Sequence, residues 1–209
     1  MTDRIPPVLR PEHPQARSLA GLVAEFDLAL DGSTDGVELT GVTLRSSEVQ
    51  PGDLYVGING KNSHGASYAR EAKDAGAVAI MTDAAGAELA MDAGLPILTV
   101  ASPREALGDI SAWVYRTAEH PPLMFGTTGT NGKTSTSYIL EAIMRQLGLV
   151  TGLSSTAERH IADMTVVSRL TTPEASELHA LLARMRARSA CISLASGVVS
   201  RETTDRSPM

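Results

Sequence analysis

The chain has 209 residues, of which 43% are hydrophobic and 20% charged, proportions that are ordinary for a globular protein with one core or two small ones. A formal net charge of −6 without a basic stripe argues against a nucleic-acid partner held through phosphate contacts. The single cysteine, Cys191, excludes an intrachain disulfide, and no apolar run approaches the length of a bilayer, so we expect a cytoplasmic protein without membrane insertion.

The first 120 residues predict a small α/β domain. Four prolines within residues 1–17 predict an extended leader rather than a helix. A helix at 18–28 and a half-buried strand near 37–41 follow. Beyond the Pro51-Gly52 turn, apolar runs and helical patterns alternate and predict strands at 54–58, 78–81 and 97–100 and helices at 68–75, 84–93 and 103–117. This alternation favours a largely parallel sheet.

His120-Pro121-Pro122 predicts a domain boundary at about residue 120, because two adjacent prolines resist both helix and central strand. We therefore expect a leader at 1–17, one domain at 18–120 and a second at 121–209. The second domain begins with an apolar strand at 123–125, a glycine-rich turn and a helix. Its remaining pattern predicts a short strand at 150–154, an irregular polar stretch at 155–170, a helix opened by Thr172-Pro173, and a sequence compatible with a strand at 191–194.

The turn after the 123–125 strand reads Gly-Thr-Thr-Gly-Thr-Asn-Gly-Lys-Thr-Ser, residues 126–135. Strand, glycine-rich turn, Gly-Lys-Thr and helix form the context of a phosphate-binding loop, whose backbone N–H groups and helix N-terminus attract phosphate oxygens. Lys133 would reach the β- and γ-phosphates, and the Thr134 hydroxyl would bind Mg²⁺. The strict spacing G-x-x-x-x-G-K-[ST] is not met, because Thr127 stands five residues before Gly132. The alternative is a glycine-rich turn with a solvated lysine.

Residues 128–134, Thr-Gly-Thr-Asn-Gly-Lys-Thr, closely resemble the nucleotide loop of the Mur ligase superfamily, whose members form amide bonds with ATP through an acyl-phosphate. Folylpolyglutamate synthetases carry a similar loop, so the loop alone does not choose a substrate. The resemblance implies ATP and Mg²⁺ as cofactors, with Lys133 as a catalytic residue and Thr134 as a metal ligand. It assigns ATP binding to Gly129, Thr130, Asn131, Gly132, Lys133, Thr134 and Ser135.

A second segment, residues 45–55, resembles the N-terminal uridine-nucleotide-binding domain of the UDP-N-acetylmuramoyl-tripeptide synthetases. That branch carries Asp-Ser-Arg-x-Val-x-Pro-Gly-Asp-Leu-Phe; Ser46, Val49 and 51–54 match it, whereas Arg45 and Ser47 differ. The resemblance implies that the uridine end of the substrate contacts Leu44 and Ser46, and that the diphosphate contacts Lys61, Asn62 and Ser63. The alternative for these residues is an ordinary solvated loop.

A third segment, Leu170-Thr171-Thr172-Pro173-Glu174, resembles the stretch by which the same branch holds its UDP-muramoyl dipeptide. Thr172 is also a natural helix cap, and both roles are compatible. The three motifs in this order favour the tripeptide synthetases over folylpolyglutamate synthetases. They imply a monomeric enzyme that adds the third peptide residue to UDP-N-acetylmuramoyl-L-Ala-D-Glu, with that dipeptide, ATP and an amino acid as its small-molecule partners.

The chain departs from this pattern beyond the Thr172 helix. The family's Glu-Val-Ser-Ser-His, whose Glu helps to bind Mg²⁺, is absent, as are the lysine that is carbamylated and the amino-acid-binding domain. We therefore expect a truncated or frame-shifted product, or a fragment, of an α/β protein, with an N-terminal and a partial central domain, inactive alone. An uncovered apolar helix face and an unpaired sheet edge would make 121–209 less stable than 37–118. The alternatives are a silent remnant that only binds ATP or a UDP-sugar, and another Mur ligase step.

Overall fold

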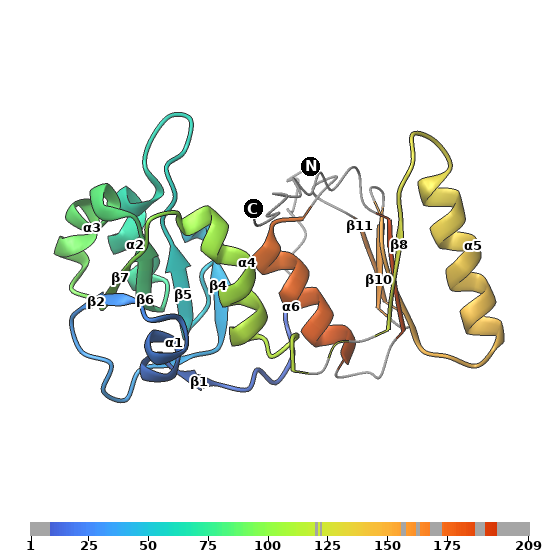
Figure 1. The fold of residues 1–209 in the computed structure, drawn as a ribbon, viewed down its shortest axis with the longest axis horizontal. Coiled ribbons are helices and arrows are strands. Elements are labelled where there is room, and N and C mark those ends of the chain that lie inside the picture. The colour runs from blue at the N-terminus through green and yellow to red at the C-terminus, as the bar shows by residue number, and fades with distance from the viewer. Residues whose placement is uncertain are drawn as a thin grey trace, which may run out of the picture. The chain divides into compact units, whose positions relative to one another are not determined.

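The computed structural model in Figure 1 describes residues 9–119, 121, 123–155, 158–161, 164–167, 173–186 and 191–195. Contacts divide the chain into two compact units. Of the described residues, those up to 121 and 173–186 form what we call the N-terminal unit. Residues 123–167 and 191–195 form the phosphate-loop unit. The segment 173–186 thus groups with the N-terminal unit, although it follows residue 120, where the sequence predicts the boundary.

The N-terminal unit is built on a five-stranded sheet with the order β2-β7-β6-β5-β4. Four neighbouring strands are parallel and only β2 at one edge is antiparallel, which confirms the predicted α/β class with a largely parallel sheet. The strands are β2 (Ala29–Asp31), β4 (Gly41–Thr43), β5 (Asp53–Val56), β6 (Ala77–Thr82) and β7 (Ile97–Thr99). Two short strands, β1 (Arg17–Ser18) and β3 (Glu38–Leu39), pair with each other outside this sheet.

Helices cover both faces of this sheet, because alternate side chains of its inner strands are apolar in both directions. Leu54 and Val56 join one buried cluster and Tyr55 joins the other. The first cluster includes side chains from α1, α4 and α6, and the second from α2 and α3. The helices are α1 (Leu19–Phe26), α2 (Ala69–Asp74), α3 (Ala84–Ala90), α4 (Pro103–Val114) and α6 (Ala175–Arg186), with single 3-10 turns at η1 (Ser46–Glu48), η2 (Gly65–Tyr68) and η3 (Met91–Ala93).

The phosphate-loop unit has a mixed sheet with the order β11-β10-β9-β12-β8 and the helix α5 (Lys133–Gln146). Its strands are β8 (Met124–Thr127), β9 (Thr151–Ser154), β10 (Glu158–Ile161), β11 (Met164–Val167) and β12 (Cys191–Ala195). Strand β12 lies between β8 and β9 and is parallel to both. Helix α5 contacts β8, β9 and β12.

The expectation of an irregular stretch at 155–170 is wrong for the part that the structure describes. Residues 158–161 and 164–167 pair as an antiparallel hairpin, and β10 also pairs with β9. The alternation in β10 is mostly polar: Arg159 is buried beside Ile161 on one face, whereas Glu158 and His160 lie on the other. A hydrophobic period of two is therefore missing, and only pairing with β9 makes this segment a strand.

Helix α5 turns an apolar stripe outward. Ile139, Ile143 and Leu147 are 60%, 49% and 71% exposed, whereas Ser137 and Glu141 are buried. This stripe agrees with the uncovered apolar helix face expected from the sequence. The opposite, buried face of α5 is polar. Its Glu141 contacts Thr151 of β9 and His160 of β10.

Candidate functional site

The phosphate-binding segment runs from the end of β8 to the first turn of α5. Gly132 precedes the helix with φ 79° and Gly129 has φ 148°, conformations that L-residues with a side chain rarely adopt. A Cβ at Gly132 would meet no other heavy atom within 4 Å. The glycine is therefore required by backbone conformation, and the space beside it is free for a ligand.

Lys133 bends back over this turn, and its Nζ donates to the Gly129 carbonyl at 2.6 Å. An ammonium has three donors, so this bond leaves others for a phosphate. The start of α5 is tied to β8 because Ser137 Oγ donates to Thr127 Oγ1 at 3.2 Å. Backbone N–H groups of a helix N-terminus, a glycine turn and a lysine together suit a polyphosphate.

The residues present fit Mg²⁺ only as a companion of a bound phosphate. Within the described residues no three His, Cys, Asp or Glu side chains are grouped so that they could hold a metal ion. The half-buried Thr134 lies in the first turn of α5 and offers one hydroxyl. Mg²⁺ commonly keeps several waters and takes one or two protein ligands beside substrate phosphates. Thr134 would be that ligand here.

The residues expected to contact the uridine nucleotide lie in segments that start at one edge of the N-terminal sheet. Leu44 and Ser46 follow β4, and Lys61, Asn62 and Ser63 lie in the loop after β5. Strands β4 and β5 are parallel neighbours, so both loops start at the same, carboxyl edge. In open α/β sheets ligands bind at this edge. The exposed Lys61–Ser63 loop and the half-buried Ser46 thus share an edge that suits a ligand.

A buried ion pair supports the turn that carries Ser46. Arg10 pairs with Asp53, and its Nη2 also donates to the Glu48 carbonyl at 3.3 Å. Asp53 accepts from the Gln50 backbone N–H at 2.8 Å. Burial raises the pKa of Asp53 and the paired Arg10 opposes that rise. The Asp of the Pro-Gly-Asp-Leu motif is therefore a structural residue that holds residues 48–50 in place.

The 61–63 loop is closed at its base by His64. Its Nδ1 accepts from the Ala66 backbone N–H at 3.1 Å, which leaves Nε2 to donate to Asp83, 3.2 Å away. Asn59 and His64 form a bridge, and the Tyr55 hydroxyl donates to the Gly65 carbonyl at 2.7 Å. These bonds hold both ends of the loop while its tip remains exposed.

Two further points concern the residues expected from the sequence. Thr171 and Thr172, expected to contact the muramoyl dipeptide, lie outside the described residues. Conversely, sequence analysis missed a polar network between α5 and β10, formed by Tyr138, Glu141, Glu158 and His160. The signal available was the spacing of Glu158 and His160, which places both on one face of a strand.

Comparisons with known proteins agree with the order of the motifs. The description "Mur ligase family, catalytic domain" matches residues 38–115 and "Mur ligase middle domain" matches residues 127–194. A UDP-N-acetylmuramyl-tripeptide synthetase of Leifsonia xyli subsp. xyli is 57% identical over 208 residues, 98% of this chain and 40% of the relative. A UDP-N-acetylmuramoyl-L-alanyl-D-glutamate–2,6-diaminopimelate ligase of Streptomyces coelicolor is 44% identical over 180 residues, 86% of this chain and 35% of the relative.

Two solved structures share the fold. A UDP-N-acetylmuramoyl-L-alanyl-D-glutamate–2,6-diaminopimelate ligase has a TM-score of 0.65 at 18% identity, covering 88% of this chain and 36% of that chain. MurF from Acinetobacter baumannii has a TM-score of 0.62 at 17% identity, again with coverage of 88% and 36%. The chain thus spans about 40% or less of the length of these relatives. None of the helices in the described ranges is long and apolar enough to cross a membrane.

Proposed function

This chain belongs to the Mur ligase family, and we propose that it binds ATP on residues 129–135 as part of an ATP-dependent ligase of peptidoglycan precursor synthesis. The observation that carries the proposal is the loop geometry: a positive-φ Gly132, the N-terminus of α5 and Lys133 meet at one open turn. Gly129, Thr130, Asn131 and Ser135 complete the ATP site. Mg²⁺, when bound with ATP, would supply charge neutralisation at the phosphates, with Thr134 as its protein ligand.

The step that we propose is the addition of the third residue to UDP-N-acetylmuramoyl-L-Ala-D-Glu. The Leifsonia relative's name supports this step, and the carboxyl-edge position of Leu44, Ser46 and 61–63 supports a uridine nucleotide there. Thr171 and Thr172 would contact the muramoyl dipeptide. In such a reaction the terminal carboxylate is phosphorylated and then attacked by an amine. Lys133 would stabilise charge on the transferred phosphoryl group.

The test is a calorimetric titration of Mg-ATP into the purified chain and its Lys133→Ala variant. Lysine donates a charged hydrogen bond to phosphate worth roughly 1.5–3 kcal/mol, so affinity should fall by about tenfold or more. Arg70→Gln is the matched control, because it also removes one positive charge from an exposed side chain, in the other unit. Equal affinity of the wild type and Lys133→Ala would overturn the assignment.

A second candidate is a binding module that forms no amide. The absence of Glu-Val-Ser-Ser-His after α6 favours it, because the family's metal-binding Glu is not present in this sequence. Both candidates predict ATP binding, and they differ in catalysis. Release of inorganic phosphate that depends on both UDP-N-acetylmuramoyl dipeptide and an amino acid supports the ligase; binding of ATP without such release supports the module.

A further inference from the structure

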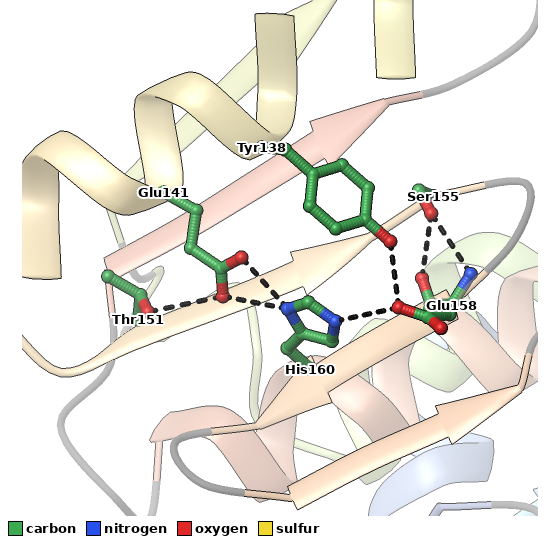
Figure 2. Close-up of polar contacts among 6 residues, drawn as sticks. All are labelled: Tyr138, Glu141, Thr151, Ser155, Glu158 and His160. Carbon is green, nitrogen blue, oxygen red and sulfur yellow. Dashed lines mark hydrogen bonds and ion pairs between the residues drawn. The ribbon is translucent and has the colours of Figure 1, made fainter. Parts of the chain in front are cut away.

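A histidine between two carboxylates joins α5 to β10 (Figure 2). His160 Nδ1 lies 2.8 Å from Glu141 Oε2, and its Nε2 lies 3.2 Å from Glu158 Oε2. The Tyr138 hydroxyl donates to the same Glu158 oxygen at 2.9 Å, and its ring packs edge-on against the imidazole with centroids 5.4 Å apart. Tyr138 and Glu141 come from α5, whereas Glu158 and His160 come from β10.

The network is mostly shielded from solvent. The side chains of His160 and Glu141 are 12% and 5% exposed, and Glu158 is 42% exposed. Thr151 on β9 donates to Glu141 at 3.4 Å. The strand residues opposite His160 are the uncharged Leu153 on β9 and Thr165 on β11. Among the described residues, the charged and titratable groups that face the imidazole are Glu141 and Tyr138 from α5 and Glu158 from its own strand.

This geometry demands a proton on each ring nitrogen. A neutral imidazole has one donor and one acceptor, so one of its nitrogens would present a lone pair to a carboxylate. With both carboxylates ionised, only the imidazolium donates to Glu141 and to Glu158. The alternatives are a protonated Glu158 or a protonated Glu141 that donates to a neutral ring. Hydrogen bonds from His160 and then from Tyr138 lower the pKa of Glu158, which opposes the first alternative.

We propose that His160 is a positioning residue of the phosphate loop, held as an imidazolium that fastens β10 to α5. Tyr138 and Glu141 lie on the second and third turns of the helix that Lys133 opens, and Ser137 beside them bonds to Thr127 at the end of β8. The network therefore fixes the same helix whose first turn holds Lys133 and Thr134. The effect on ATP rests on the proposed function; the protonation of His160 does not.

The fastening acts within a window of pH. As pH rises and the imidazolium loses a proton, one of its two carboxylate contacts is lost. As pH falls, protonation of Glu158 removes an acceptor charge. Since the pKa of Glu158 is lowered in the folded protein, its bond to His160 stabilises the fold at any pH above the ordinary pKa of a glutamate. That stabilisation is lost only as pH falls through the lowered pKa.

Nitrogen NMR of the ¹⁵N-histidine-labelled wild-type chain tests the protonation directly. At about pH 7 both ring nitrogens of His160 should carry protons. A single neutral tautomer of His160 at this pH would overturn the proposal. This measurement needs no variant and no nucleotide.

Fluorescent-ATP titrations of the wild type and His160→Gln from about pH 6 to about pH 9 test the positioning role. We expect the variant to bind ATP about threefold more weakly at the acid end, a coupling typical of neighbouring residues, with the difference vanishing as the wild-type imidazole loses its proton. His13→Gln is the control and should leave the pH profile unchanged. A difference that stays constant with pH refutes the role. If the wild type binds no ATP at any pH, the proposed function fails while the nitrogen spectrum still decides the protonation.

Discussion

Individual residues of the phosphate loop are constrained by backbone conformation more than by packing. Gly132 adopts φ 79° with no heavy atom within 4 Å of where a Cβ would lie. Gly126, in β8, likewise has an open Cβ position, but its φ lies outside the left-handed region. The two glycines therefore separate the cost of backbone strain from the cost of an added methyl group.

Gly132→Ala should destabilise the phosphate-loop unit by about 1 kcal/mol, because the left-handed conformation is strained for alanine. It should also weaken ATP binding, because relief of that strain moves the backbone N–H groups of the loop. Urea unfolding followed by far-UV circular dichroism and an ATP titration measure the two effects. Gly126→Ala is the matched control and should change neither by more than about 0.5 kcal/mol. Equal effects of the two substitutions would show that strain at Gly132 does not matter.

At the scale of elements, α6 joins the N-terminal unit by packing on α4 (Figure 1). Beside this packing, the hydroxyl of Thr117, which follows α4, lies 2.7 Å from Nδ1 of His179 on α6. Burial lowers the pKa of His179, and the charge of Asp109 opposes this only partly. The contact between α6 and the segment after α4 therefore contains a histidine that prefers to be neutral.

The sign of the pH effect follows from that shift. The pKa of His179 is lower in the folded state than in the unfolded chain, so protons bind preferentially to the unfolded chain. Stability of the N-terminal unit should be full above the ordinary histidine value of about 6.5 and should decline as pH falls through it, by at most about 1.4 kcal/mol per pH unit. Urea unfolding read by Trp113 fluorescence measures it. His179→Gln should flatten the slope between about pH 7 and pH 5.5; His13→Gln, an exposed control, should not.

At the scale of the whole molecule, the chain consists of two compact units with separate sheets. Both large buried apolar clusters consist of residues of the N-terminal unit. The phosphate-loop unit leaves the Ile139, Ile143 and Leu147 stripe exposed. Unequal burial of apolar surface predicts unequal stability.

Thermal or urea unfolding should therefore occur in two steps. Trp113, the single tryptophan, lies in the N-terminal unit and should report only the more stable step. Circular dichroism should show both steps. Mg-ATP at a hundredfold excess over its dissociation constant should raise the free energy of unfolding of the phosphate-loop unit, the first step, by about 2.7 kcal/mol. The second step should not change. One transition that coincides in both signals, or a Trp113 transition that moves with ATP, would contradict this prediction.

Local signals in the sequence were sufficient for the elements that depend on short-range chemistry. Helix α4 begins at Pro103 and α5 at Lys133 after Gly132, where the sequence predicts these helices to start. The alternation of apolar runs with helical patterns also predicted the α/β class. These features depend on backbone conformation and on hydrogen bonds between residues three or four apart, which a sequence displays directly.

Tertiary structure alone decided how distant segments meet. Strand β12 enters between β8 and β9, and the β10–β11 hairpin forms although its polar alternation lacks an apolar period. Arg10 pairs with Asp53, 43 residues further along the chain. His160 lies between Glu141 of α5 and Glu158, which is two residues away on the same strand. Sequence spacing does not report such contacts, because they form only when packing excludes water from charges that would otherwise be solvated.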